Sequence, residues 1–199
     1  MTEKELMLSE HLYIADDEEL ARDHQNARRL TRLINTLTEE DAKEQRALYR
    51  QLFGHVGERF WVEPPFRTDY GCHTYIGEDF YANYDCIFID VAEIHIGNNV
   101  MFGPRVCIFT AGHPIDPVIR NSKLEYGKEV HIGDNVWIGG NTVINPGVTS
   151  GNNVVKRTSR NRLASSSILC PSFKYLRFTS PTGLIPPSDD IFSDSAVLT

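Results

Sequence analysis

Three histidines recur at a constant interval in the middle of the chain. His95, His113 and His131 lie 18 residues apart, and an imidazole with a pKa near neutral can either move a proton or bind a metal ion. Pro114 directly follows His113 and restricts the backbone before it to an extended conformation, which would hold that ring in place. His113 is therefore the candidate general base, and the alternative interpretation is an ordinary histidine of a surface loop.

Residues 76–155 repeat with a period of six. From Ile76 the sequence divides into ten hexads such as IGEDFY, IGNNVM and IGDNVW, most of them led by an aliphatic or aromatic residue. This period is the signature of a parallel β-helix, in which three hexads close one triangular coil and the leading side chains point inward. Gly and Asn are expected at corners with positive φ. Ten hexads predict about three coils.

The period of six also bears on a second interpretation of the three histidines, in which they bind a metal ion. Histidines spaced by one coil could stack and hold zinc between subunits. However, residues 114–130 do not keep the period, so an inserted loop over 113–130 is expected to leave the column, and no closely spaced histidine pair is present. The sequence therefore predicts no metal requirement.

The composition is that of an ordinary globular protein. The 199 residues carry 20 basic and 27 acidic side chains, a net charge of −7. No apolar run reaches the length of about 18 residues that a membrane span needs, so we expect neither a membrane segment nor broad nucleic-acid binding. Because the first fifteen residues lack the apolar core of a secretory signal and the four cysteines form no C-x-x-C pair, we expect a cytoplasmic location.

Helical spacing precedes the repeat and a divergent segment follows it. Residues 1–55 carry capping signals at Thr2 and Asp16 and predict a small helical region packed on the main body. The period stops at Lys156, and the residues from there on hold nine serines and one glycine. This tail is expected to be disordered or to cap the column through residues 168–178. The predicted domains are thus 1–55, 56–155 and 156–199.

Several strings resemble one known family. EPPFRTDYG, FYANYD and TAGHPIDPVIRNSKLEYGKEVHIGDNVWIGGNTVINPGVT, together with the start MTEKELMLSEHLY, are similar to the maltose and galactoside O-acetyltransferases, which are hexapeptide-repeat transferases. The resemblance implies a left-handed parallel β-helix with a small N-terminal helical region. It also implies acetyl transfer from acetyl-CoA to a sugar hydroxyl in a homotrimer, with the active site between neighbouring prisms.

The resemblance assigns roles to individual residues. It implies that His113 takes the proton of the sugar hydroxyl and that the Asn83 amide stabilises the transition state, although Asn83 could instead be a corner residue with positive φ. The remaining assignments are Asp17, Asp69 and Tyr81 to the sugar and Trp137 and Gly140 to acetyl-CoA. For three of these a structural role is the alternative: a helix cap for Asp17, and packing for Tyr81 and Trp137.

The tail departs from the family pattern. Relatives continue the repeat where this sequence reads KRTSRNRLASSS, so we expect a shortened acetyl-CoA site with weaker binding. A catalytically impaired homologue, or an acyltransferase with a different acceptor, is therefore a second hypothesis.

Overall fold

Short helices and one strand form the N-terminal part. The computed structural model describes residues 1–156 and the backbone of residues 175–177. The first elements are α1 (Glu3–Leu8), β1 (Tyr13–Ile14), α2 (Glu18–Ile34), η1 (Glu39–Asp41) and α3 (Ala42–Leu52). The capping box of Thr2 with Glu5 is confirmed. The second cap is Asp17 rather than Asp16, because Asp17 Oδ1 accepts hydrogen bonds from Glu19 N and Leu20 N.

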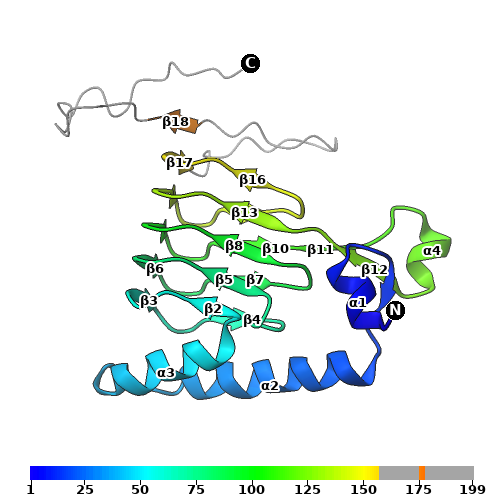
Figure 1. The fold of residues 1–199 in the computed structure, drawn as a ribbon, viewed down its shortest axis with the longest axis horizontal. Coiled ribbons are helices and arrows are strands. Elements are labelled where there is room, and N and C mark those ends of the chain that lie inside the picture. The colour runs from blue at the N-terminus through cyan, green and yellow to red at the C-terminus, as the bar shows by residue number, and fades with distance from the viewer. Residues whose placement is uncertain (157–174, 178–199) are drawn as a thin grey trace.

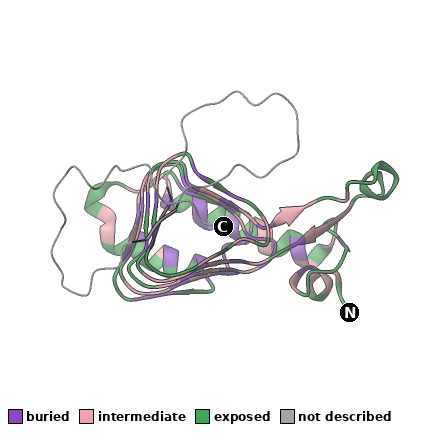
Figure 2. Ribbon diagram, turned by 90° about the horizontal axis from the view of Figure 1, so that it is seen from above, coloured by how far each residue is buried: buried purple, intermediate pink, exposed green. Residues whose placement is uncertain are grey.

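Three parallel sheets form the sides of a triangular column (Figures 1 and 2). The first face contains β2 (His55–Val56), β5 (Thr74–Ile76), β8 (Ile94–Ile96), β13 (Val130–Ile132) and β16 (Thr149–Ser150). The second face contains β3 (Phe60–Val62), β6 (Phe80–Ala82), β9 (Met101–Phe102), β14 (Trp137–Ile138) and β17 (Val154–Lys156). The third face contains β4 (Arg67–Thr68), β7 (Ile87–Ile89), β10 (Cys107–Phe109) and β15 (Val143–Ile144). The predicted parallel β-helix is confirmed.

The column is longer than the predicted three coils. Its strands make four complete coils and two sides of a fifth, because β2, β3 and β4 already form a coil ahead of Ile76. The leading positions of this first coil are Val56, Val62 and Thr68, all buried. A polar Thr as a leading residue and the Pro64-Pro65 pair hide the period of six there.

The core fills the inside of the prism. The leading residues counted from Ile76 are buried as predicted: Ile76, Ala82, Phe88, Ile96, Phe102, Ile108, Ile132, Ile138 and Ile144. Phe88 packs edge to face against Phe66 of the coil below, with ring centroids 5.0 Å apart. From α3, Tyr49 packs on the same Phe66. Helices α2 and α3 lie across the first coil and cover that end of the core (Figure 1).

Most glycines of the repeat do not occupy the positive-φ corners at which they were expected. In eight of the ten hexads the fourth position has a positive φ, and these positions hold Asp79, Asp85, Asn99, Arg105, Asn135, Asn141, Gly147 and Asn153. The glycines at the second position have another use. A Cβ on Gly97 would lie 2.8 Å from the carbonyl carbon of Gly133 in the next coil, so glycine there permits close stacking of the coils. Asn83 also lies at a corner but has no positive φ, so the alternative that a left-handed backbone conformation selects it is wrong.

A β-arm leaves the column between the third and first faces. It contains β11 (Ala111–Gly112), α4 (Pro117–Asn121) and β12 (Leu124–Gly127), and β12 pairs antiparallel with both β11 and β1. Figure 2 shows the arm projecting from one corner of the triangle, together with the N-terminal elements. The interruption of the period at 113–130 therefore marks a segment that leaves the column and returns to it.

The described part of the column reaches the residue at which the period stops. Lys156 is buried at the inward position of β17, in register with Ile138, and β18 (Tyr175–Arg177) pairs antiparallel with β17. The other predictions for the tail concern 157–174 and 178–199, which lie outside the described residues. Within the part that the structure describes, no helix has the length and apolar character of a membrane span.

Truncation of Phe88 tests the aromatic core. Phe88 is fully buried between Phe66 and Phe102, so Phe88→Ala should lower the free energy of unfolding by about 3–5 kcal/mol through lost contacts and a cavity. Denaturant titration followed by circular dichroism measures this. Leu33→Ala, on the exposed side of α2, is the control and should cost less than about 1 kcal/mol. Equal losses in the two variants would contradict the assigned core.

Candidate active site

Four of the predicted residues lie on the second face or at its turn into the third face. Tyr81 and Trp137 point outward from β6 and β14, and Met101 of β9 lies between them in register. Met101 and Trp137 are each about half exposed, with 52% and 46% of their surface accessible. Together they form an apolar strip along the outside of the coils, which suits an extended ligand with a carbon chain.

Asn83 begins the turn that follows β6. Its backbone N donates to Phe102 O of the next coil at 3.0 Å, and its Oδ1 accepts from Tyr84 N at 2.8 Å. The side-chain carbonyl is thus fixed while the Nδ2 donors make no hydrogen bond within the described chain. A fixed amide with free donors can stabilise an oxyanion.

Gly140 lies at the same corner, two coils above Asn83. A Cβ at this position would stand 2.9 Å from Pro104 O, and the next residue, Asn141, has a φ of 58°. Close packing on Pro104 therefore explains this glycine structurally, and its bare backbone would also allow a ligand to come near.

His113 lies at the other edge of the third face. It follows β11 at the base of the arm, and its ring is exposed. Thr110 fixes the start of the arm: its Oγ1 accepts from Ala92 N at 2.9 Å and donates to Ile89 O at 2.8 Å. The imidazole is consequently presented by an anchored strand, although the ring itself is open to a ligand.

Asp69 lies at this edge too, directly after β4. Its Oδ1 is 3.7 Å from His24 Nε2 of α2. Burial raises the pKa of the Asp69 carboxyl, an effect that His24 opposes and that the nearby Asp90 reinforces. The position of Asp69 is consistent with hydrogen bonding to a polar ligand.

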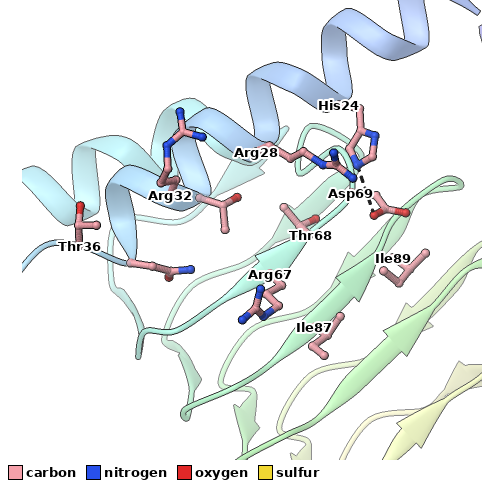
Figure 3. A pocket seen from close by; sticks show the side chains of 11 residues that line it. His24, Arg28, Arg32, Thr36, Arg67, Thr68, Asp69, Ile87 and Ile89 are labelled. Atoms are coloured by element: carbon pink, nitrogen blue, oxygen red, sulfur yellow. Dashed lines mark ion pairs between the residues drawn. The ribbon is translucent and has the colours of Figure 1, made fainter.

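A groove of about 500 Å³ separates α2 from the third face (Figure 3). Asp69 and His24 lie at one end of it, and Ile87 and Ile89 line its wall on the column side. The arginines that line it are Arg28, Arg32 and Arg67. Carboxylate acceptors, guanidinium donors and an apolar wall are the groups that recognise a hydroxylated ring.

Asp17 has a structural role that the sequence left open. As the N-cap of α2 it uses Oδ1 for two backbone hydrogen bonds, of 2.9 Å to Glu19 N and 3.1 Å to Leu20 N. Its part in sugar binding stays a prediction, which would have to rest on the second carboxylate oxygen.

A buried carboxylate behind the His113 edge was missed by sequence reasoning. Asp90 is inaccessible to solvent, and it accepts hydrogen bonds from Thr68 Oγ1 at 2.7 Å, Tyr70 N at 2.9 Å and Thr74 Oγ1 at 3.1 Å. His73 Nδ1 donates to its carbonyl at 2.8 Å. This network ties two coils together at the corner from which the arm leaves. The only signal in the sequence was an aspartate between apolar residues, Ile89 and Val91, of the hexad FIDVAE.

The predicted residues thus separate into two groups. Asn83 and Gly140 lie at the corner between the second and third faces, with Tyr81 and Trp137 beside them. His113 and Asp69 lie at the corner between the third and first faces, with the start of α2 nearby. One chain therefore holds the two groups at opposite edges of its third face.

Comparisons with known proteins agree with this description. Residues 6–57 match the maltose acetyltransferase hexapeptide capping motif. A maltose O-acetyltransferase from Clostridium difficile superposes with a TM-score of 0.77 at 47% identity, over 79% of this chain and 93% of that one. The galactoside O-acetyltransferase of Lactococcus lactis is 36% identical over 74% of this chain and 72% of its own length.

A third relative carries a ligand. A hexapeptide-repeat-containing acetyltransferase of Vibrio cholerae, complexed with acetyl coenzyme A, superposes with a TM-score of 0.71 at 33% identity, over 83% of this chain and 98% of that one. The fold and these matches define an acetyltransferase built on a left-handed parallel β-helix. The chain belongs to the maltose and galactoside O-acetyltransferase family.

Substitution of Asp69 should improve folding and impair acceptor binding. Because its raised pKa means that the folded state favours the protonated carboxyl, the ionised form costs stability at neutral pH. Asp69→Asn should therefore raise the free energy of unfolding at pH 7, by an amount that shrinks as the pH falls through that pKa. The KM for the acceptor should rise.

Asp23→Asn is the matched control for stability. Asp23 accepts a 2.7 Å hydrogen bond from Lys4, whose pKa it raises, so this variant should lose stability. Denaturant titration at several pH values measures both variants, and a loss of stability in Asp69→Asn at pH 7 would contradict the assignment.

Proposed function

We propose that this protein transfers the acetyl group of acetyl-CoA to a hydroxyl of a sugar of the maltose, glucose or galactoside type. We further propose that two neighbouring copies in a homotrimer complete each active site. The proposal of a shared site rests on one observation: His113 and Asn83 lie at opposite edges of the third face. A cyclic arrangement brings one edge of each copy against the other edge of its neighbour.

His113 acts as the general base in the proposed reaction. A sugar hydroxyl attacks the thioester carbonyl carbon while His113 accepts the hydroxyl proton; the C–O bond forms, the C–S bond breaks, and the proton passes to the departing sulfur. Positioned proton transfer of this kind typically contributes about 10²–10⁴-fold to the rate. The exposed ring on an anchored strand supports this assignment.

Asn83 of the neighbouring copy stabilises the oxyanion. Its Oδ1 is held by Tyr84 N, which leaves the Nδ2 donors for the carbonyl oxygen of the thioester. Such a donor is worth about 3 kcal/mol of transition-state stabilisation. The acetyl group passes directly to the sugar, without an acyl-enzyme intermediate. Cys86 would be a poor nucleophile, because burial raises the pKa of its thiol to about 11 and keeps it protonated.

The two substrates occupy different surfaces. Asp69 and Tyr81 contact the sugar, the former from the groove beside α2. The pantetheine arm of acetyl-CoA lies along the strip of Met101 and Trp137 and passes close to Gly140. The acetyl-CoA complex of the Vibrio cholerae relative supports this donor.

Loss of the His113 ring tests the proposed base. His113→Ala should lower the turnover number by about 10²–10⁴-fold with little change in oligomeric state, because the ring is exposed. Release of CoA thiol with maltose, glucose and a galactoside measures turnover. His55→Ala, another exposed histidine, should keep full activity. Unchanged turnover in His113→Ala would remove His113 from the mechanism.

Mixing inactive variants tests the shared site. If His113 of one copy acts with Asn83 of the next, co-expressed His113→Ala and Asn83→Ala chains should recover about a quarter of wild-type activity, since random assembly leaves one interface in four intact. Each variant alone should be inactive. Failure to recover activity in mixed oligomers would place both residues in the same copy.

The end of the repeat favours a second candidate. Because the charged Lys156 takes the inward position of β17 that is in register with Ile138, an impaired homologue with weak acetyl-CoA binding, or an acyltransferase for another acceptor, would also fit. Thiol release by the unaltered protein separates these. Release with sugars supports sugar transfer, release only with amines supports another acceptor, and no release with either supports the impaired homologue.

A further inference from the structure

The outer side of the first face carries a column of side chains that the proposed reaction does not use. His55, Tyr75, His95, His131 and Thr149 occupy paired positions of five neighbouring strands. A groove of about 420 Å³ runs along this column. The column is thus reachable from solvent over its length.

Two histidines of the column are stacked. The rings of His95 and His131 lie 4.8 Å apart between centroids and are parallel within 2°. Each ring has a carboxylate beside it: His95 Nε2 lies 2.8 Å from Glu93 Oε2, and His131 Nε2 lies 2.9 Å from Glu129 Oε2. The side chains of the two histidines keep 38% and 45% of their surface exposed. Both rings therefore face the groove with a hydrogen-bonded carboxylate at hand.

The geometry of these side chains is close to that of a metal site. Ligand atoms of His95, Glu129 and His131 all lie within 4.8 Å of one another. Zinc bonded to two imidazole nitrogens at about 2.0–2.1 Å in tetrahedral geometry needs those nitrogens about 3.3 Å apart. Because the two rings are parallel, each also has to turn about its Cβ–Cγ bond so that one nitrogen lone pair points at the shared ion. The backbone needs no change, because parallel neighbours hold both residues in register about 4.8 Å apart.

The sequence-based argument against a metal does not apply to this pair. That argument assumed that His95, His113 and His131 would stack on three successive coils, and it noted that residues 114–130 break the period. The arm leaves and re-enters the column at one corner, so β8 and β13 are direct neighbours and His95 pairs with His131 without His113. The spacing of 36 residues between them hides this closeness in the sequence.

We propose that His95, Glu129 and His131 bind a late first-row divalent cation such as Zn²⁺, with water at the remaining position. Two imidazoles and one carboxylate suit Zn²⁺, Co²⁺ or Ni²⁺ better than Mg²⁺ or Ca²⁺, which prefer oxygen ligands. The ion joins the coils on either side of the arm, so it stabilises the column next to the strand that carries His113.

Metal titration of the full-length protein tests this proposal without either substrate. After treatment with EDTA and dialysis, calorimetry with ZnCl₂ should give one site per chain, and Co²⁺ should give the visible absorption of a tetrahedral ion. The melting temperature should rise with Zn²⁺ because the ion binds the folded state. His131→Gln and Glu129→Gln should weaken binding at least tenfold and abolish the thermal shift.

His55→Gln is the matched control, since His55 lies in the same column two coils away from His95. Its affinity for Zn²⁺ should be that of the unaltered protein. Circular dichroism verifies that each variant is folded, and Glu129→Gln, which replaces a half-buried carboxylate by an amide of the same shape, serves if His131→Gln does not fold. No stoichiometric binding, or binding that His131→Gln and Glu129→Gln leave unchanged, would overturn the proposal. The acetyl-transfer proposal is tested separately and does not depend on this result.

Discussion

The inward stacking of one apolar side chain per hexad is the constraint on which the rest of the structure depends. Ile76, Ile96 and Ile132 lie one above another, and each is almost fully buried. Burial of one such side chain contributes about 1.5–3 kcal/mol, and neighbouring coils satisfy the backbone hydrogen bonds of one another. The period of six therefore determines the triangular cross-section, and with it which residues lie at an edge and which on a face.

The functional residues follow from that cross-section. A corner position such as Asn83 has its backbone bonded to the coil above, so its side chain is presented from a rigid support. The arm is the exception, because its residues bury little in the column and are held mainly by β1 and by Thr110. A rigid edge and a projecting arm therefore lie on the same prism, and this is the arrangement on which the proposal of a site shared between two copies rests.

Much of the fold could be predicted because the repeat is local. The leading residues, the excursion at 113–130 and the helical start all depend on contacts that spacing reveals. Other features depend on contacts that spacing cannot reveal. The predicted β-helix domain began at residue 56, but the first coil was not counted among the hexads because Thr68 leads one of them. The expectation of positive φ holds for Asn99 and Gly147, whereas close stacking of the coils selects second-position glycines such as Gly97. The left-handed sense of the coil came from the family resemblance, since spacing alone is equally compatible with either hand.

The candidate site shows the same division. Residue type and the following proline indicated His113, and the family resemblance indicated Asn83, whereas their separation across the third face is a property of the closed coil. The buried Asp90 network joins residues 16 to 22 positions apart through side-chain hydrogen bonds that no repeat predicts. The pairing of His95 with His131 likewise depends on the arm returning to the corner that it left.

A crystal structure of the assembled protein with acetyl-CoA bound tests the central claim most directly. The account predicts that the thioester carbon lies between the His113 ring of one copy and the Asn83 amide of its neighbour, with the pantetheine arm along Met101 and Trp137. A thioester bound by both residues of a single copy, or bound away from His113, would contradict it.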